Sequence, residues 1–274
     1  MTIFSGKAFS QKLERTEARA SADFVESHAK LFPENGAEWV EIAGVYALFD
    51  GPGSPSTQTY GLGIFDEITD TELDEIEEFF KCRNAPVFHE VSPMADPSLI
   101  GLLNKRGYQP VELTSVLIRP LDVENELDLA VNPNIRTRII REDEVELFAQ
   151  TSTGGWSSEM PEFSDMMLQY SRVGAQSSGA LPFIADLNDE AIATGTLYIC
   201  GEVALLAGAS TIPSGRRQGA QNALLSARLS YARDQGCKIA MMGALPGSQS
   251  QRNAEKNGFR TAYTRIKWKL VSPK

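Results

Sequence analysis

The chain has few of the features that mark a secreted, metal-binding or membrane protein. Only three cysteines and two histidines occur among its 274 residues, and no two cysteines have the Cys-x-x-Cys spacing. This favours neither a disulfide framework nor a metal site, so we predict a reducing, cytoplasmic setting and no bound metal. The N-terminal segment lacks an apolar stretch of signal-peptide length, and no run of ~18 apolar residues occurs. Secretion and membrane association are therefore not expected.

Positive charge is also scarce, and it is unevenly distributed. The formal net charge is −10, which argues against general binding to nucleic acid. Residues 1–130 contain 10 basic and 23 acidic residues, whereas residues 131–274 contain 16 and 13. A polyanionic ligand is therefore expected in the second half.

The length fits two α+β domains of ordinary size. The acidic segment 121–134 is interpreted as a linker, which gives domains over residues 1–125 and 126–274. Both halves show the same order of strands and helices, ending in a short helix, a glycine followed by an aromatic residue (Gly107-Tyr108 and Gly258-Phe259) and a final strand. This order indicates an internal repeat.

Apolar periodicity and breaker residues predict the individual elements. In the first half we expect helices over 1–30, 70–81 and 97–105, and strands over 39–49, 57–65, 85–91 and 112–118. In the second half we expect helices over 143–151, 161–172, 219–235 and 248–257, strands over 135–140, 182–186, 191–199, 203–211, 238–242 and 262–270, and a loop over 153–158.

The most informative segment is a strand followed by a loop rich in glycine and arginine, which leads into a helix. The apolar run 203–209 precedes the loop, which contains Arg216, Arg217 and Gly219. A helix N-terminus offers unpaired N–H groups and a positive dipole to a phosphate. Gly219 allows a close backbone approach, and the two arginines add charge. The alternative is an ordinary helix start that binds nothing.

Two motifs in the second half resemble those of the GNAT superfamily of acyl-CoA-dependent N-acyltransferases. Thr211-Ile-Pro213 with Arg216 to Gln221 is similar to the family's Val-x-Pro-x-x-[Arg/Gln]-x-x-Gly-x-[Gly/Ala]. Ser248 to Phe259 is similar to Asn/Ser-x-x-Ala-x-x-x-Tyr-x-x-x-Gly-Phe. The resemblance covers about residues 135–270, and tandem GNAT proteins would account for the first half. It implies two GNAT-like domains, each a mixed, mostly antiparallel sheet flanked by helices.

The resemblance also implies how acetyl-CoA is held. Backbone groups of Ala209, Ser210 and Thr211 would pair with the pantetheine arm like an added strand. Ser250 or Asn253 would contact the cofactor from its other side, although Asn253 is open to a local capping or turn role. The pyrophosphate would be cradled by the loop and first helical turn, comprising Arg216, Arg217, Gln218, Gly219, Ala220, Gln221 and Asn222.

The sequence departs from the family pattern at two positions. Gln221 replaces the second Gly/Ala, so its side chain must point away or bind the ligand. Ala254 replaces the tyrosine that many members use as general acid, and the nearby Tyr263 is expected to pack on the last strand. The corresponding loop of the first half, residues 65–72, is acidic and has no arginine or glycine. Its carboxylates would repel a pyrophosphate, so no CoA is expected there.

The acceptor side is less well defined. Trp156 and Glu159 are expected near the acceptor, where Glu159 or Glu162 would bind a cationic amine or relay a proton. The alternatives are a loop anchor for the tryptophan and solvated helix charges for the acids. His28 and His89 are expected to be surface or packing residues, and no general base is identified.

The resemblance thus implies an N-acetyltransferase that moves the acetyl group of acetyl-CoA to a primary amine of a small molecule or protein. The amine would attack directly in a ternary complex, without a metal, while backbone N–H groups near Ser210 and Thr211 hold the oxyanion. A homodimer is a compatible assembly. One alternative is a non-catalytic acyl-CoA-binding or sensing protein, which the missing tyrosine favours; another is an interaction module. A P-loop and a dinucleotide-binding fingerprint are both absent from the sequence.

Overall fold

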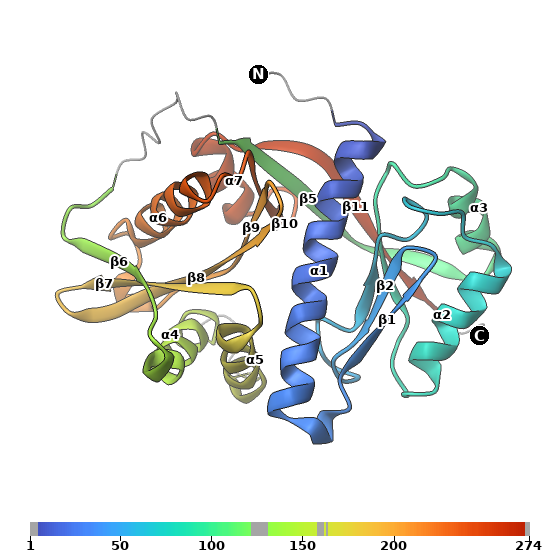
Figure 1. The fold of residues 1–274 in the computed structure, drawn as a ribbon, viewed down its shortest axis with the longest axis horizontal. Coiled ribbons are helices and arrows are strands. Elements are labelled where there is room, and N and C mark those ends of the chain that lie inside the picture. Colours follow the sequence, from blue (N-terminus) through green and yellow to red (C-terminus); the bar gives the residue numbers. More distant parts are fainter. Residues whose placement is uncertain (1–4, 122–130, 158–161, 163, 272–274) are drawn as a thin grey trace. The chain divides into compact units, whose positions relative to one another are not determined.

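The computed structural model describes residues 5–121, 131–157, 162 and 164–271. The chain forms two compact units, which Figure 1 draws as a ribbon. Unit 1 comprises Met1–Ile118 and Gly243–Lys274, and unit 2 comprises Arg119–Met242. The division expected from the sequence, after residue 125, had placed residues 243–274 in the second domain. They belong with unit 1 because the last strand of the chain pairs on both sides with strands of that unit.

Unit 1 is built on a mixed sheet with the strand order β1-β2-β3-β4-β11-β5. Only the β3–β4 pair is parallel. The strands are β1 (Glu38–Ile42), β2 (Val45–Phe49), β3 (Gln58–Tyr60), β4 (Phe88–Val91), β5 (Tyr108–Pro120) and β11 (Arg260–Leu270). The helices are α1 (Lys7–Leu31), α2 (Asp70–Lys81), α3 (Ser98–Lys105) and α7 (Gln249–Lys256), with a 3-10 turn at Pro33–Asn35.

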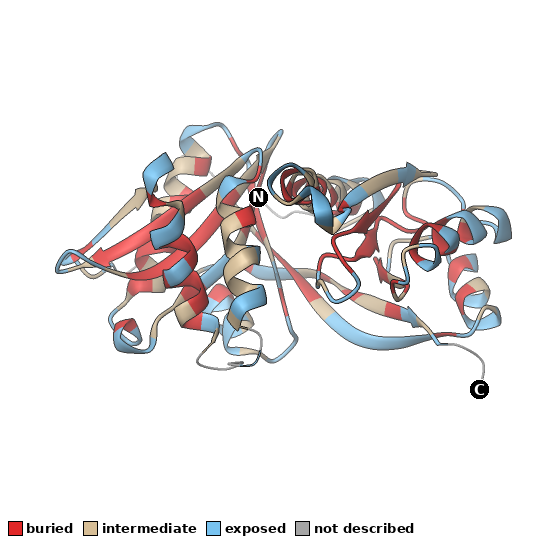
Figure 2. Ribbon diagram, turned by 90° about the horizontal axis from the view of Figure 1, so that it is seen from below, coloured by how far each residue is buried: buried red, intermediate tan, exposed pale blue. Residues whose placement is uncertain are grey.

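The core of unit 1 follows the apolar stripe of α2 and the strands beneath it. Leu73, Ile76 and Phe80 recur at helical spacing and are fully buried against Val45 and Ala47 of the sheet. Figure 2 shows buried residues concentrated in the strands and on the inner sides of the helices. Burial of this one face fixes how α2 lies on its sheet.

Unit 2 is a sheet with the strand order β10-β9-β8-β7-β6, in which only β9–β10 is parallel. Its helix α6 lies on one face and helices α4 and α5 lie on the other (Figure 1). The strands are β6 (Ile135–Ile139), β7 (Ala180–Leu187), β8 (Glu190–Cys200), β9 (Val203–Thr211) and β10 (Ile239–Ala244). The helices are α4 (Val145–Trp156), α5 (Ser164–Gln176) and α6 (Ala220–Asp234), with 3-10 turns at Glu142–Glu144 and Pro213–Gly215. The predicted fold class is confirmed.

Two expected strands of the first half are shorter than predicted. The region 39–49 is a hairpin, because Ala43 and Gly44 have φ angles of 47° and 75° and form a two-residue turn. Strand β3 ends at Tyr60 because Gly61 and Gly63 also have positive φ angles, 83° and 70°. In the described residues, no helix has both the length and the apolar character needed to cross a lipid bilayer.

Candidate functional site

The site in unit 2 begins at a bulge in strand β9. Thr194 of β8 opposes Ser210, whereas Thr196 opposes Ala207, so β9 contains one extra residue in this stretch. Gly208, with φ of 59°, lies at the bulge. Gly208 and Ala209 are exposed, although residues 203–206 of β9 are buried. The bulge therefore turns this part of the strand toward solvent.

Strand β9 also has an open edge next to the bulge. Its parallel ladder with β10 ends at the pair Leu205–Met241, while its pairing with β8 continues to Thr211. Among the described strands, the last residues of β9 are thus paired on one side only. A strand edge of this kind can accept an extended ligand as an additional strand.

The loop after β9 connects this strand to the N-terminus of α6. Arg217 and Gly219 both adopt left-handed backbone angles, with φ of 61° and 89°. Gly219 is the N-cap residue and offers no side-chain cap. The first hydrogen bond of the helix runs from the Ala223 N–H to the Gly219 carbonyl over 3.1 Å. The first amides of a helix have no i−4 carbonyl to bond, and such a helix start can bind an anion.

Gln221 joins the start of α6 to the end of β9. Its side-chain Nε2 donates to the Ser210 carbonyl over 2.9 Å and to Thr211 Oγ1 over 2.7 Å. This side chain was expected to point away or to bind the ligand, and in the structure it binds the strand. A glutamine is suited to this position because its amide can donate two hydrogen bonds.

Helix α4 covers the end of β9 more closely than expected. The predicted loop 153–158 is wrong, because α4 continues to Trp156. At Gly155 an added Cβ would lie 2.3 Å from Ser210 Oγ and 2.8 Å from the Thr211 nitrogen. Ser210 Oγ in turn donates to the Ser152 carbonyl over 2.8 Å. The close contact between helix and strand thus requires a glycine at position 155. From the sequence, this glycine had been interpreted as part of a loop.

The two arginines of the loop differ in backbone conformation and in their contacts. Arg216 Nη2 donates to the Gly155 carbonyl over 3.3 Å, near the C-terminus of α4, where a positive charge is favourable. Arg217 is exposed on the left-handed turn. Both arginines are exposed, but Arg216 contacts the end of α4, a difference that the sequence did not indicate.

The remaining predicted residues are placed as follows. Ala220 is buried, and Gln218 accepts a hydrogen bond at its carbonyl from Asn132 Nδ2 over 2.8 Å. Asn132 was not expected at the site because it lies in the segment 121–134, which was interpreted as a linker. Trp156 is the exposed last residue of α4, Glu162 is exposed, and Glu159 lies outside the described residues.

Ser250 and Asn253 lie in unit 1 and not in unit 2. Both are exposed on α7. Asn253 Oδ1 accepts a hydrogen bond of 2.6 Å from Gln249 Nε2, and its carbonyl accepts from Asn257. These contacts of Asn253 are local to its helix. Ala254, at the position of the family tyrosine, is buried.

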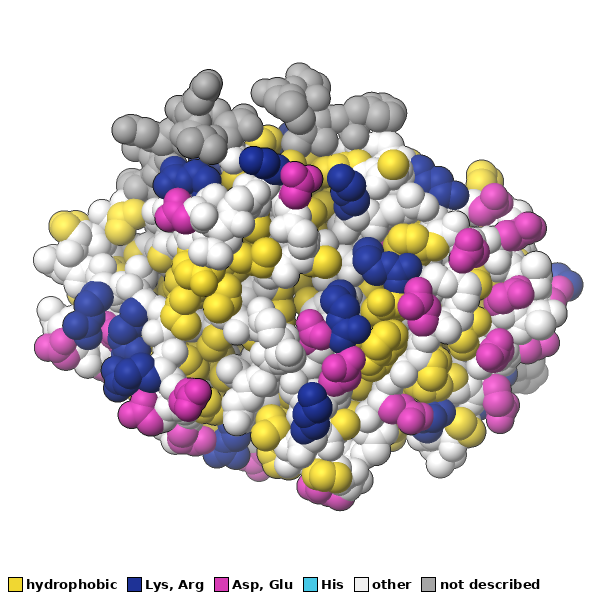
Figure 3. Space-filling model, in the orientation of Figure 1, with side chains coloured by type: hydrophobic (Ala, Val, Ile, Leu, Met, Phe, Trp, Pro, Cys, Tyr) yellow, Lys and Arg dark blue, Asp and Glu magenta, His cyan; other side chains and the backbone are white. Residues whose placement is uncertain are grey.

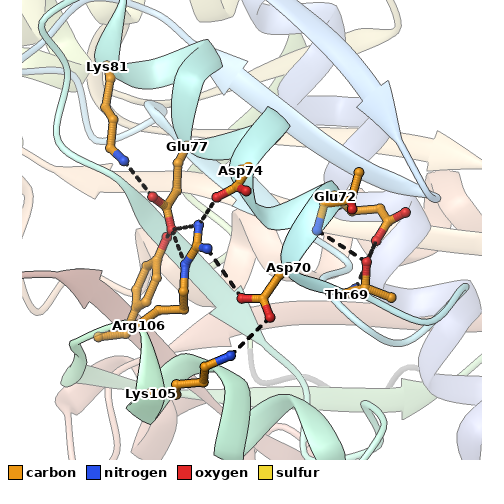
Figure 4. Close-up of polar contacts among 10 residues, drawn as sticks. Thr69, Asp70, Glu72, Asp74, Glu77, Lys81, Lys105 and Arg106 are labelled. Atoms are coloured by element: carbon orange, nitrogen blue, oxygen red, sulfur yellow. Dashed lines mark hydrogen bonds and ion pairs between the residues drawn. The ribbon is translucent and has the colours of Figure 1, made fainter.

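The helix start in unit 1 that corresponds to α6 is chemically different. Thr69 and Glu72 form a reciprocal capping box, so side chains of the chain itself cap the N-terminus of α2 (Figure 4). Acidic side chains gather over α2 in Figure 3. Arg106 forms ion pairs with three of them, Asp70, Asp74 and Glu77. This helix start is already satisfied by intramolecular contacts.

Both histidines lie in unit 1 and are buried, as packing residues. His28 Nδ1 lies 2.5 Å from Asp50 Oδ1. Burial lowers the pKa of His89 to about 3, so its ring is neutral at physiological pH. Tyr263, on β11, is buried and donates a hydrogen bond of 2.7 Å to Glu14 Oε1. Its expected packing on the last strand is confirmed.

Comparisons with known proteins agree with this geometry. Residues 142–259 match the family model described as "Acetyltransferase (GNAT) family". No curated protein matches the sequence. A GCN5-related N-acetyltransferase from Kribbella flavida has 17% identity and a TM-score of 0.60, with 93% of this chain and 96% of that chain covered.

Two further solved structures share the fold. A GCN5-related N-acetyltransferase from Sphaerobacter thermophilus has 14% identity and a TM-score of 0.58, covering 87% of this chain and 77% of that one. A tandem GNAT protein from the clavulanic acid biosynthesis pathway has 14% identity and a TM-score of 0.56, covering 83% and 74%. Residues 142–259 therefore match the GNAT acetyltransferase family, and the chain shares its fold with a tandem GNAT protein.

Proposed function

We propose that unit 2 is an N-acetyltransferase that moves the acetyl group of acetyl-CoA to a primary amine of a small molecule or protein. One observation carries the proposal: the open edge of β9 is followed, after a short loop, by a helix whose N-terminus has no side-chain cap. The first feature suits an extended amide-containing arm, and the second suits a pyrophosphate. CoA contains both groups in this order.

The proposed binding mode uses backbone groups more than side chains. The pantetheine arm lies along Ala209, Ser210 and Thr211, and the pyrophosphate lies against the amides that start α6. Arg217 is the arginine that contributes charge, because Arg216 is engaged with the Gly155 carbonyl. Trp156, exposed at the end of α4, forms part of the acceptor side.

In the proposed reaction, a neutral amine attacks the thioester carbon in a ternary complex. A C–N bond forms, the C–S bond breaks, and CoA leaves as a thiol with the proton that the amine gives up. Backbone N–H groups at the β9 edge stabilise the oxyanion of the tetrahedral intermediate. Residue 254 does not act as a general acid in this reaction, since alanine has no proton to donate.

Unit 1 is proposed to bind no CoA. Its corresponding helix α2 is capped by Thr69 and Glu72, and carboxylates surround its first turns. A pyrophosphate placed there would compete with the existing capping box for the helix N–H groups, and the carboxylates would repel it.

The binding step is tested by calorimetric titration of acetyl-CoA into the wild type, Arg217→Ala and Arg233→Ala. Arg233 provides a matched control because it lies at the opposite end of α6. Loss of one charge-assisted phosphate contact costs about 1.5–3 kcal/mol, so the Arg217→Ala affinity should fall by about tenfold or more. The Arg233→Ala affinity should stay near that of the wild type. Absence of wild-type binding would refute the proposal and favour an interaction module.

A second candidate function is a non-catalytic acyl-CoA-binding or sensing protein, which the alanine at position 254 favours. The two candidates differ in turnover. Release of free thiol from acetyl-CoA that depends on an added amine, across a panel of small amines and lysine peptides, supports the acetyltransferase. Tight binding without thiol release from any member of the panel supports the sensor.

A further inference from the structure

A buried arginine lies beneath the bulge of β9. Arg228, on the inner side of α6, is 3% exposed. None of the ion pairs formed by the described residues includes it. Its burial without a carboxylate lowers its pKa to about 10, so the guanidinium stays charged at neutral pH. A buried cation of this kind is costly unless its donors are satisfied.

Carbonyl groups on three elements accept hydrogen bonds from two nitrogens of this guanidinium. Nε donates to Leu224 within α6 over 3.2 Å. Nη1 donates to the Thr196 carbonyl over 3.2 Å and lies 3.5 Å from the Ala207 carbonyl. Thr196 and Ala207 face each other in the β8–β9 ladder, at the register shift that defines the bulge. Arg228 thus connects α6 to both strands at the point where the ladder is irregular.

The neighbouring strand makes room for this arginine. A Cβ added to Gly195 would lie 2.8 Å from both Cζ and Nη1 of Arg228. Gly195 has no left-handed backbone angle that would otherwise require glycine. Space for the guanidinium is therefore the physical reason for a glycine between Thr194 and Thr196.

We infer that Arg228 is a positioning residue, which holds the bulge of β9 so that the Gly208–Ala209 edge stays exposed for the pantetheine arm. This inference rests on the proposed function. The charged hydrogen bonds keep two carbonyls directed toward α6. The strand consequently cannot relax into a regular ladder with β8, which would realign the exposed residues with their neighbours.

The test measures binding of the whole cofactor and of its nucleotide part separately. Acetyl-CoA and 3′-phospho-ADP, which is the nucleotide part without the pantetheine arm, are titrated into the wild type, Arg228→Met and Gly195→Ala. Arg228→Met removes the charge and donors but keeps an unbranched apolar side chain. Gly195→Ala keeps the arginine and displaces its guanidinium. Arg233→Met on the same helix is the matched control.

Both variants should lose about tenfold or more in acetyl-CoA affinity, because a disordered edge must be ordered on binding. Affinity for 3′-phospho-ADP should change by less than about twofold, because the start of α6 is unchanged. Thermal unfolding identifies the folded variants, and Arg228→Lys, which keeps the charge, replaces Arg228→Met if that variant does not fold.

Equal losses for both ligands would overturn the inference, since they indicate a general loss of structure. Unchanged affinity for both ligands in folded variants would also overturn it. Wild-type protein that binds neither ligand would instead refute the proposed function.

Discussion

The side-chain amide of Gln221 donates a hydrogen bond of 2.9 Å to the backbone carbonyl of Ser210. This bond joins the first turn of α6 to the last residues of β9, the two parts of the proposed cofactor site. The residue that departs from the family pattern is therefore part of the framework of the site. Its contribution can be measured separately from that of the arginines.

Replacement of Gln221 by glutamate should weaken acetyl-CoA binding more than replacement by alanine. Alanine removes two hydrogen bonds, each worth about 0.5–1.5 kcal/mol. Glutamate also cannot donate to the Ser210 carbonyl, and it adds a negative charge beside the proposed phosphate position. Calorimetric titration of both variants gives the comparison, and stronger binding by Gln221→Glu than by Gln221→Ala would contradict it.

The variant Gly155→Ala should destabilise unit 2 by about 1–3 kcal/mol, because the added methyl overlaps the end of β9. Its Cβ would lie 2.3 Å from Ser210 Oγ. Urea-induced unfolding measures the effect. Gly101→Ala is the matched control, since Gly101 lies within helix α3 with nothing within 4 Å of its added Cβ. That control should be neutral or stabilise by about 0.5–1 kcal/mol; similar losses in both variants would contradict the close contact.

Loss of Arg106 should destabilise unit 1 more than loss of its neighbour Lys105. Arg106 Nη2 lies 3.0 Å from Glu77 Oε1, and the Glu77 side chain is only 6% exposed. Arg106→Met leaves this buried carboxylate with fewer partners, at a cost of about 1–3 kcal/mol. Lys105 is mostly exposed, and its pairing with Asp70 is worth about 0–1 kcal/mol. Urea unfolding of Arg106→Met and Lys105→Met tests the order, and equal effects would contradict the role of burial.

The free energy of unfolding of unit 1 should decrease as the pH is lowered, because of His89. Its folded pKa is about 3, below its ordinary value of 6.5. The unfolded chain therefore binds the proton first as the pH falls. The stabilisation by the neutral ring is complete above pH 6.5 and is lost toward pH 3, by about 1.4 kcal/mol per pH unit.

His89→Gln removes this titration and keeps a group that can pair with Thr59, whose Oγ1 lies 2.8 Å from His89 Nδ1. Urea unfolding of both proteins between pH 4 and pH 7 provides the measurement. The difference in unfolding free energy between them should change with pH across this range. A constant difference would contradict a neutral buried histidine.

Local patterns predicted several helices and strands to within one residue. The strand 203–211 and the helix 70–81 are confirmed with the expected bounds, and helix 219–235 differs from α6 by one residue at each end. Apolar periodicity and flanking glycines determine such elements without help from distant residues.

What the sequence did not reveal depends on contacts between distant residues. The need for glycine at position 155 comes from its contact with β9, and the need for glycine at position 195 comes from its contact with Arg228. Neither contact can be recognised from the neighbouring residues in the sequence. The separate roles of Arg216 and Arg217 also depend on where α4 ends. Each of these cases requires knowledge of which element packs on which, and a single sequence does not contain that information in local form.

The membership of β11 in unit 1 has a consequence for synthesis on the ribosome. Unit 2 is one continuous stretch, Arg119–Met242, and its residues are all available before translation ends. The sheet of unit 1 contains β11 between β4 and β5, so it lacks an interior strand until residues 260–270 have emerged. Although most of unit 1 is translated first, unit 2 should reach its native structure earlier. The nascent N-terminal portion must therefore remain soluble until residues 260–270 have been synthesised.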